Sequence, residues 1–502
     1  MKRMLDVEKT RRSYHADRAM NSTHRASLMV PEFDGADAEI SFLNHFLLKR
    51  GYPNVACRVT AIDPEGARIV SRLVPINEPK VYTIPLSGMV DEVVDSYQVE
   101  FFAADNLFIP FPAVMINHRG DGFVNSVHAY NRVLNDVFED DEINQVHQRE
   151  AAIDVRYDDV AETFLVFHAG PQPVDDVLRA ELTLPDGRVL NAEHSIRCPK
   201  LCRKIIMLSD LFPELPKPLG GGTLKVDQPR QFLFYGRMLV GQKTADGAFS
   251  ANHSYYDCAD FPEYWDNSEP SGRVYPFLPK FDNILRFYPI MSPGDLSFNV
   301  SLFDPDGREL GARNLGQIST PKGNDLEFSV TDFVAQAGID PGTVSGFGIT
   351  ARPSSGNTPT RVNHQLVYGA GGLESSINIS LTNPNVFVPA GKKGFSWGQV
   401  LVGGGMTSQL GLVGMTPSAP GASASVKFYD ARGQIAERQV ELANRGAAVF
   451  DVAEELESEL DSSRLEEGDC VWYQVATDRP DPSAIVASRN DVTGHSVGEH
   501  SF

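Results

Sequence analysis

A short turn with the pattern Asp-Pro-x-Gly, or a close variant of it, occurs four times in the chain, and its regular spacing limits the possible folds. The turns end at glycines that follow one another after 121, 120 and 126 residues, namely Gly66, Gly187, Gly307 and Gly433. An alternating apolar run precedes each turn, and a second extended run follows it. Because proline sets φ and glycine accepts a positive φ, each turn with its flanks predicts a β-hairpin. Four such hairpins at near-constant spacing indicate a repeated domain.

The similarity between the copies continues beyond the hairpin. In each copy a short apolar strand leads into a residue whose side-chain oxygen can cap a helix, and these residues are Ser87, Ser209, Thr331 and Asp451. Such an oxygen accepts a hydrogen bond from an N–H group of the first helical turn. We therefore expect one short helix in each copy, followed by a further strand.

These patterns predict an all-β protein made of four tandem antiparallel β-sandwich repeats of about 120 residues, each with one short helix. The predicted repeats cover residues 35–150, 151–275, 276–384 and 385–502, after a polar N-terminal arm over residues 1–34. A stretch rich in glycine, serine and proline, residues 403–423, is expected to form a flexible loop or an irregular hairpin in the fourth repeat.

Acidic residues outnumber basic ones, and this balance argues against some partners. The chain has 66 Asp and Glu residues against 45 Lys and Arg residues, which gives a net charge of −21. Such a chain repels phosphate groups, so we expect neither nucleic acid nor a membrane as a partner. No apolar run reaches the length of a membrane span, and the first residues lack the apolar segment of a secretory signal. The expected location is the cytoplasm, with export independent of a signal as the open alternative.

Cysteine is scarce, and its placement does not indicate a disulfide framework or a metal site. The five cysteines are an odd number spread along the chain. The closest pair, Cys198 and Cys202, is spaced one residue too widely for a thioredoxin-type motif and lacks the second pair that a zinc site needs. We favour ordinary packing over a redox or metal role for this pair. The sequence predicts no cofactor and no metal site.

Histidine is the one reactive residue type that follows the repeat. Four histidines lie 62, 66, 57 and 62 residues after their turn glycines, namely His128, His253, His364 and His495. His128 and His253 each lie six residues after the glycine of a second turn and two residues before a tyrosine, Tyr130 or Tyr255. We expect buried histidines on equivalent strands whose nitrogens are satisfied locally. The alternative is a ligand or metal site built from them.

Aromatic residues give a second indication of binding. A segment at the predicted end of the second repeat interleaves aromatic side chains with carboxylates, a combination that serves either a carbohydrate site or a seal between domains. The candidate ligand-binding residues are His128, Tyr130, Asn252, His253, Tyr255, Tyr256, Tyr264 and Trp265. No catalytic residue can be assigned, because the G-x-S-x-G match at residues 394–398 lacks the strand-then-helix context of a nucleophile elbow.

Two functional hypotheses follow from these features. The first is a non-enzymatic multidomain binding protein whose partner is a glycan, a polymer or a second copy of the chain. The second is a β-sandwich enzyme that acts on a sugar-like or small polar substrate with histidines and carboxylates in a cleft between repeats. The repeats keep turns and caps without a dense polar constellation, which favours the first hypothesis. A run without charge, residues 395–416, also has to be covered, either by a neighbouring unit or by a second copy of the chain, and we favour a homo-oligomer.

Overall fold

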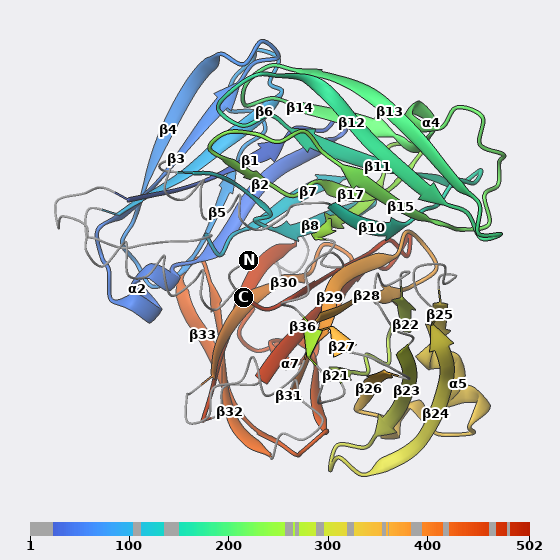
Figure 1. The fold of residues 1–502 in the computed structure, drawn as a ribbon. Coiled ribbons are helices and arrows are strands. Elements are labelled where there is room, and N and C mark those ends of the chain that lie inside the picture. Colours follow the sequence, from blue (N-terminus) through green and yellow to red (C-terminus); the bar gives the residue numbers. More distant parts are fainter. Residues whose placement is uncertain are drawn as a thin grey trace. The chain divides into compact units, whose positions relative to one another are not determined.

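The chain folds into two compact units, shown in blue to green and in yellow to red in Figure 1. The first unit comprises residues 1–121 and 125–257, and the second comprises residues 122–124 and 258–502. The computed structural model describes residues 24–103, 112–134, 150–256, 265–266, 271–287, 296–318, 326–353, 358–359, 361–382, 394–414, 421–460, 468–478 and 482–502. Within these ranges, no helix has the length and hydropathy needed to cross a lipid bilayer.

The first unit begins with eight strands that form two antiparallel sheets. They are β1 (His24–Pro31), β2 (Ala36–Leu43), β3 (Val55–Ile62), β4 (Arg68–Ile76), β5 (Val81–Pro85), β6 (Ser96–Ala103), β7 (Met115–Gly120) and β8 (Phe123–His128). The strand orders are β1-β6-β3-β4 and β5-β2-β7-β8. We call these strands the first set. A short helix, α2 (His45–Arg50), follows β2, and β9 (Asn131–Val133) pairs with β1.

Eight further strands of the first unit, the second set, repeat this topology. They are β10 (Glu150–Asp154), β11 (Ala161–His168), β12 (Val174–Thr183), β13 (Val189–Cys198), β14 (Arg203–Met207), β15 (Thr223–Asp227), β17 (Leu239–Thr244) and β18 (Phe249–His253). Their orders, β10-β15-β12-β13 and β14-β11-β17-β18, match the first set strand for strand. The remaining elements are α4 (Leu208–Leu211), β16 (Phe234–Gly236), which pairs with β9, and β19 (Tyr255–Tyr256), which pairs with β10.

The second unit starts with a third set in the same order. Its strands are β21 (Ser271–Pro276), β22 (Asp282–Phe287), β23 (Leu296–Phe303), β24 (Glu309–Ile318), β25 (Leu326–Ser329), β26 (Gly346–Pro353), β28 (Arg361–Gly369) and β29 (Ser375–Thr382). These strands form two four-stranded halves, with the orders β21-β26-β23-β24 and β25-β22-β28-β29. Pairing between β21 and β29 joins the halves into one eight-stranded sheet. Its other elements are β20 (Trp265–Asp266), α5 (Val330–Gln336), η2 (Pro341–Thr343) and β27 (Thr358–Pro359).

A fourth set completes the second unit. Its strands are β30 (Gly394–Val402), β31 (Met406–Gly414), β32 (Ala422–Asp430), β33 (Gly433–Leu442), β34 (Ala447–Asp451), β35 (Asp469–Thr477), β36 (Pro482–Asn490) and β37 (Ser496–His500). The orders are β30-β35-β32-β33 and β34-β31-β36-β37, with helix α7 (Val452–Glu455) after β34.

The predicted all-β antiparallel fold is confirmed, and so are the four hairpins around the recurring turns. They join β3 to β4, β12 to β13, β23 to β24 and β32 to β33. The four turn glycines have positive φ angles of 81, 83, 76 and 128°. The division into four units stays a prediction, because the chain groups into two compact units that each contain two sets.

Three predicted boundaries differ from the observed strands. Residues 24–31 form β1 and are not part of a polar arm, while residues 1–23 lie outside the described residues. Strand β21 starts before the predicted boundary at residue 276. Residues 406–414, expected in a loop, form β31, which is paired on both sides. Consecutive glycines at 403–405 make the turn before this strand, because all three adopt a positive φ.

The predicted helix caps are correct at one position of four. Asp451 accepts the capping hydrogen bond of α7 from the amide of Glu454. Helix α5 is capped instead by Ser329, and Thr331 accepts a hydrogen bond from the amide of Asn283. The prediction is also wrong at the other two positions. Ser209 lies inside α4, and Ser87 lies in a turn that is not part of a helix. The hydroxyl oxygens of Ser87 and Thr331 accept hydrogen bonds from distant amides, those of Ala38 and Asn283, and do not cap a helix.

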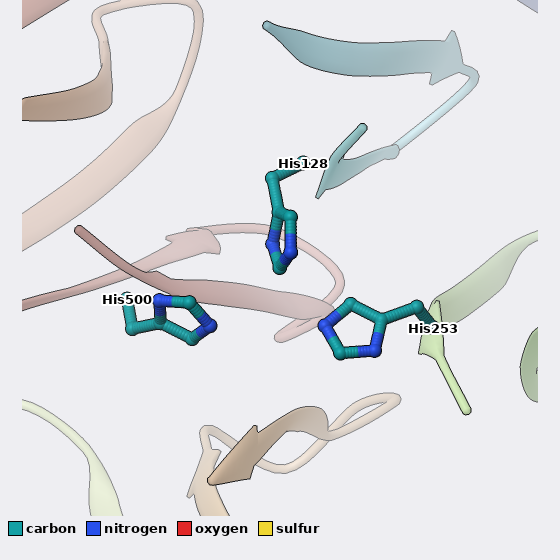
Figure 2. A group of neighbouring side chains, drawn as sticks. All are labelled: His128, His253 and His500. Atoms are coloured by element: carbon teal, nitrogen blue, oxygen red, sulfur yellow. The ribbon is translucent and has the colours of Figure 1, made fainter. Parts of the chain in front are cut away.

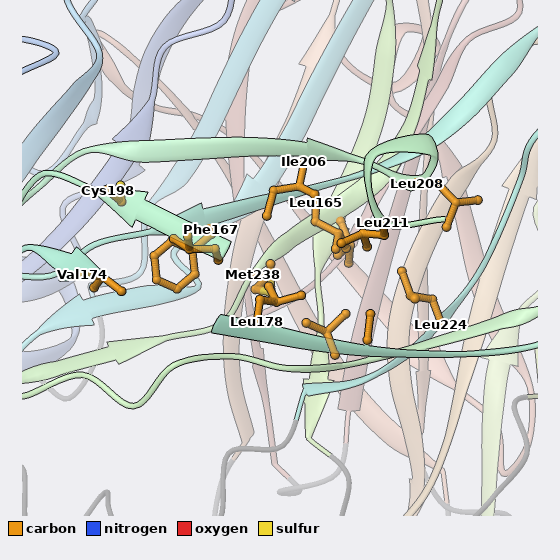
Figure 3. Packing of buried hydrophobic residues seen from close by; sticks show 14 of the residues in the cluster. Leu165, Phe167, Val174, Leu178, Cys198, Ile206, Leu208, Leu211, Leu224 and Met238 are labelled. Atoms are coloured by element: carbon orange, nitrogen blue, oxygen red, sulfur yellow. The ribbon is translucent and has the colours of Figure 1, made fainter. Parts of the chain in front are cut away.

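The core of the second set is shared with the first set. Leu165, Phe167 and Leu178 pack between its two sheets (Figure 3). The same cluster includes Met29 and Ile62 of the first set. Burial of such side chains contributes about 25 cal/mol per Å² of apolar surface, so the two sets of the first unit stabilise each other.

The described part of the uncharged run, residues 395–414, contributes side chains to the core of its own unit. Val400, Val402 and Leu410 are fully or almost fully buried in the core of the fourth set. This packing supplies the cover that the sequence led us to expect from a neighbouring unit or a second copy. A homo-oligomer stays a prediction without support from this run.

Candidate functional site

Two of the predicted histidines lie side by side in the first unit. His128 ends β8 and His253 ends β18, and these two strands hold the same place in their sheets. The ring centroids are 4.5 Å apart and the rings are inclined at 74° (Figure 2). His253 is 2% exposed, whereas His128 is half-buried. The structure therefore brings together two residues that the sequence relates only by their offset from a turn.

Polar neighbours hold the ring of His253. Nη1 of Arg237 lies 3.1 Å from its Nδ1 and 3.4 Å from its Nε2, and the carbonyl oxygen of Ser254 lies 3.0 Å from its Nδ1. Arg237 also donates from Nε to the hydroxyl of Tyr235 at 3.3 Å. A neutral imidazole offers one donor and one acceptor, which these neighbours can engage. A divalent cation on His253 would have to displace the guanidinium, so these contacts favour a structural role.

A histidine that was not among the predicted four holds the same position in the fourth set. His500 ends β37, the strand that corresponds to β8 and β18. It lies six residues after Gly494, the offset that His128 and His253 have from their own turn glycines. The offset from the hairpin glycine Gly433 predicted His495 instead, which lies just before β37. Figure 2 also draws His500, which belongs to the second unit.

Two further candidate residues, His364 and Tyr130, each belong to a buried tyrosine–histidine pair. His364 lies on β28, not on the last strand of its set, and its Nε2 is 2.7 Å from the hydroxyl of Tyr275. In the first unit the hydroxyl of Tyr130 lies 2.9 Å from Nε2 of His168. Burial lowers the pKa of both histidines to about 3. A neutral imidazole accepts a hydrogen bond from a phenol, so Tyr130 serves as the partner of a buried histidine.

The remaining candidate residues that the structure describes lie in strands. Asn252 accepts through Oδ1 from the amide of the following residue at 2.7 Å. Tyr255 and Tyr256 form β19, and Trp265 lies in β20. Tyr264 lies outside the described residues. A ligand-binding role of these aromatic residues stays a prediction.

The cysteine pair flanks a loop that packs on the first set. The thiol of Cys202 donates to the carbonyl oxygen of Asp63 at 3.3 Å, and the hydroxyl of Ser96 donates to the carbonyl oxygen of Leu201. Burial raises the pKa of Cys198 to about 11 and that of Cys202 to about 12. Metal binding and disulfide exchange require the thiolate, so the raised pKa values favour a packing role.

This loop and the first Asp-Pro-x-Gly turn form a close contact that we call the seam. A Cβ atom added to Gly66 would lie 2.5 Å from the carbonyl oxygen of Lys200. The next residue, Leu201, has a positive φ of 62°. The amide of Arg203 donates to Oδ2 of Asp95 at 2.7 Å. These contacts join the first and second sets at the end of the β3–β4 hairpin.

The second unit contains an equivalent seam between the third and fourth sets. A Cβ atom on Gly307 would clash with the carbonyl oxygen of Asn444. The next residue, Arg445, has a positive φ of 65°. The amide of Ala447 donates to the hydroxyl of Ser345 at 3.2 Å, as the amide of its counterpart in the first unit does to a carboxylate. The seam is therefore a repeated structural feature.

A cavity of about 390 Å³ opens at the seam of the first unit. Arg68, Lys200 and Gln98 line it together with apolar side chains that include Val133 and Leu201. Nη2 of Arg68 donates to Oε1 of Gln98 at 3.2 Å, which orients the guanidinium. No carboxylate is found among the described residues of this lining, although the chain as a whole is acidic. The volume of this cavity lies in the range of small-molecule sites, roughly 300–1,000 Å³.

The seam of the second unit forms without these cations. The turn, the strand register and the close contact identify the positions that correspond to those of the first unit. The residues that correspond to Arg68, Gln98 and Lys200 are Glu309, Gly348 and Asn444. One cation is replaced by a carboxylate and the other by an amide. Two other lining residues, Ala67 and Leu201, correspond to Arg308 and Arg445, so the second seam places its cations at different positions. The group of Arg68, Gln98 and Lys200 is therefore specific to the first unit, which makes the cavity a candidate binding site.

Comparison with known proteins assigns no family. No protein-family model matches the sequence, and no curated protein matches it. Among solved structures, a tetra-tandem repeat in the extending region of a large adhesion protein is 10% identical, covers 95% of this chain and 98% of its own, and has a TM-score of 0.11. Chicken CNTN1 FN1–FN3 domains are 9% identical, with coverages of 72% and 99% and a TM-score of 0.13. A β-glucuronidase of Bacteroides uniformis is 12% identical, with coverages of 46% and 26% and a TM-score of 0.13. Likenesses at these TM-scores carry no argument about function.

Proposed function

We propose that this chain is a non-enzymatic β-sandwich binding protein and that the seam cavity of the first unit binds an anionic group of its ligand. The observation that carries this proposal is a cavity of about 390 Å³ lined by Arg68 and Lys200. A carboxylate or phosphate that entered it would meet a guanidinium, an ammonium group and the amide of Gln98. Hydrogen bonds between charged partners are about twice as strong as those between neutral groups.

Both cations are available to a ligand. Within the described part of the chain, neither Arg68 nor Lys200 forms an ion pair with a carboxylate. Arg68 donates to a neutral partner, Gln98, and its side chain is exposed. Both side chains are exposed, so an incoming anion would exchange their hydrating water for charged partners, while salt screens the long-range field of this chain of net charge −21.

The lining favours binding over catalysis. General acid–base catalysis needs a side chain that gains and loses a proton near the working pH, most often histidine or a carboxylate. The described residues that line the cavity include neither. The alternative hypothesis of an enzyme has no support from this cavity.

The proposal is tested by titrating the full-length chain with glucuronate, citrate and inorganic phosphate in a calorimeter, with glucose as the neutral comparison. We expect at least one of the anions to bind and glucose not to bind. The double variant Arg68→Glu with Lys200→Asn should abolish binding and remain folded, because these residue types occupy the corresponding seam positions of the second unit.

A matched control separates the cavity from a general charge effect. Arg197→Glu with Lys204→Asn makes the same change of charge on the surface of the same unit, and it should leave anion binding unchanged. Failure of all three anions to bind, or equal loss of binding in both double variants, would contradict the proposal. Conversion of a bound acid into a product would favour the enzyme hypothesis.

A further inference from the structure

The two ends of the seam cavity differ in polarity, and the fold determines which residues lie at each end. Arg68 lies two residues after Gly66, and a Cβ atom added to Gly66 would lie 2.5 Å from the carbonyl oxygen of Lys200. Arg68 and Lys200 therefore belong to the same end of the cavity. Both side chains are exposed, so this cationic end is open to water.

Val133 and Pro171 lie together at the other end of the cavity. Val133 on β9 is the strand partner of Phe234 on β16. Pro171 follows Gly170, and a Cβ atom added to Gly170 would lie 2.4 Å from Cβ of Phe234. Val133 is 4% exposed, and Pro171 is half-buried. This end of the cavity is therefore apolar and more buried than the cationic end.

Gln98 lies between the two ends. It belongs to β6, the middle strand in the order β9-β1-β6-β3-β4, whereas Arg68 and Val133 belong to the two outer strands of these five. Gln98 accepts from Nη2 of Arg68 at 3.2 Å, so the guanidinium reaches across β3 to the middle of the sheet. Two strand spacings of about 4.8 Å separate β6 from β9, which leaves about 10 Å for the apolar part of a ligand.

The apolar end is an addition to the repeated fold. Strand β21 of the third set corresponds to β1, but its second neighbour is β29 of the same set. Among the described strands, the pair of β9 and β16 has no counterpart in the second unit. The apolar end is therefore specific to the first unit, as the group of Arg68, Gln98 and Lys200 is.

We propose that the ligand of the cavity is a small organic acid with an apolar body, whose carboxylate binds Arg68 and Lys200 and whose body extends toward Val133 and Pro171. This inference rests on the proposed function of the cavity. The carboxylate would stay at the end that is open to water, so it would keep part of its hydration. The apolar body would leave water for an apolar wall, which is the favourable term in most binding.

A hydrophilic acid is less complementary to this lining. A sugar acid that filled the cavity would place hydroxyl groups against Val133 and Pro171, whose side chains have neither a donor nor an acceptor. Buried hydroxyl groups without hydrogen-bond partners weaken a complex. The polarity of the lining therefore selects acids by the part of the molecule that carries no charge.

The test compares three probes on the full-length chain by calorimetry, namely phenylbutyrate, glucuronate and phenylbutanol. Glucuronate has the carboxylate without the apolar body, whereas phenylbutanol has the apolar body without the charge. We expect phenylbutyrate to bind at least about tenfold more tightly than either of the other two, because each of them lacks one of the two complementary parts.

Protein variants separate this inference from the proposed function. Val133→Thr keeps the shape of the side chain but adds a hydroxyl at the apolar end, so it should weaken phenylbutyrate about fivefold or more and leave glucuronate unchanged. Val155→Thr is the matched control, since Val155 is also 4% exposed in the same core cluster but is not among the described residues that line the cavity. It should leave both acids unchanged. The variant Arg68→Glu with Lys200→Asn should lose both acids.

Each other outcome contradicts the inference. Glucuronate that binds as tightly as phenylbutyrate, or equal effects of Val133→Thr and Val155→Thr on phenylbutyrate, would overturn the apolar body and leave the anion cavity standing. Phenylbutanol that binds as tightly as phenylbutyrate would overturn both proposals, because the cations would then contribute nothing. Failure of both acids to bind would also overturn both.

Discussion

Gly66 lies so close to Lys200 that a Cβ atom on the glycine would sit 2.5 Å from the lysine carbonyl oxygen. Gly187 ends the corresponding turn of the second set and has almost the same positive φ, 83° against 81°, but no atom lies within 4 Å of its added Cβ. The two glycines therefore share a backbone requirement and differ in the seam contact. A comparison of their alanine variants measures that contact.

Gly187→Ala should lower the free energy of unfolding by about 1 kcal/mol, because alanine is strained at positive φ. Gly66→Ala should lower it by a further 1–3 kcal/mol or so, because its Cβ also forces the seam apart. Urea unfolding of the full-length variants, followed by tryptophan fluorescence and circular dichroism, measures both values. Equal midpoints for the two variants would contradict the seam contact.

Buried histidines predict a loss of stability in mild acid. Burial lowers the pKa of His45 and His118 to about 4 and that of His168 and His364 to about 3, from an ordinary value of 6.5. As the pH falls below 6.5, the unfolded chain binds protons that the native chain excludes, so stability decreases until the native pKa is reached. Each histidine should cost about 1 kcal/mol by pH 5.5.

Urea midpoints at pH 7.5 and 5.5 test this expectation, and the His168→Gln variant should show a smaller decrease than the parent chain. Burial raises the pKa of Glu32 and Asp95 above their ordinary values of 4.5 and 3.8. These two carboxylates therefore change the stability with pH in the opposite direction to the histidines. A midpoint that does not change between these pH values would show that the four imidazoles are protonated in the native chain.

Thiol labelling tests the packing role of the cysteine loop. With pKa values of about 11 and 12, Cys198 and Cys202 should react with iodoacetamide at pH 8 at least about a hundredfold more slowly in the native chain than in urea. Mass spectrometry of the labelled peptides measures both rates. Rapid labelling of native Cys202 would favour the redox hypothesis.

Replacement of the observed cap of α5 tests the corrected helix start. The Ser329 hydroxyl accepts a hydrogen bond from the amide of Asp332, so Ser329→Ala should cost about 1 kcal/mol. Ser209→Ala removes a hydroxyl inside α4 that caps no helix and should change stability by less than about 0.5 kcal/mol. Thermal unfolding of both variants gives the comparison, and a larger effect at Ser209 would restore the cap predicted from the sequence.

Features that depend on neighbours along the chain were predictable. The hairpin turns follow from proline and glycine at fixed places, since their φ preferences act within a few residues. The offset of six residues from a turn glycine placed His128 and His253 on corresponding strands, and the same rule applied to Gly494 would have identified His500. The helix caps were less predictable, because a hydroxyl such as that of Thr331 can serve a distant amide instead.

The sequence by itself therefore determined the strand content, the hairpins and their repetition, because turn chemistry and alternation of apolar residues are local. Only the tertiary structure decided which copies share a core, and which side chains line a common cavity. Arg68 and Lys200 are more than one hundred residues apart and line one cavity because Gly66 allows the two backbones to approach. The pairing of Tyr130 with His168 likewise depends on packing between sets. Long-range packing selects among many residues with suitable chemistry, and a pattern along one chain carries no record of that selection.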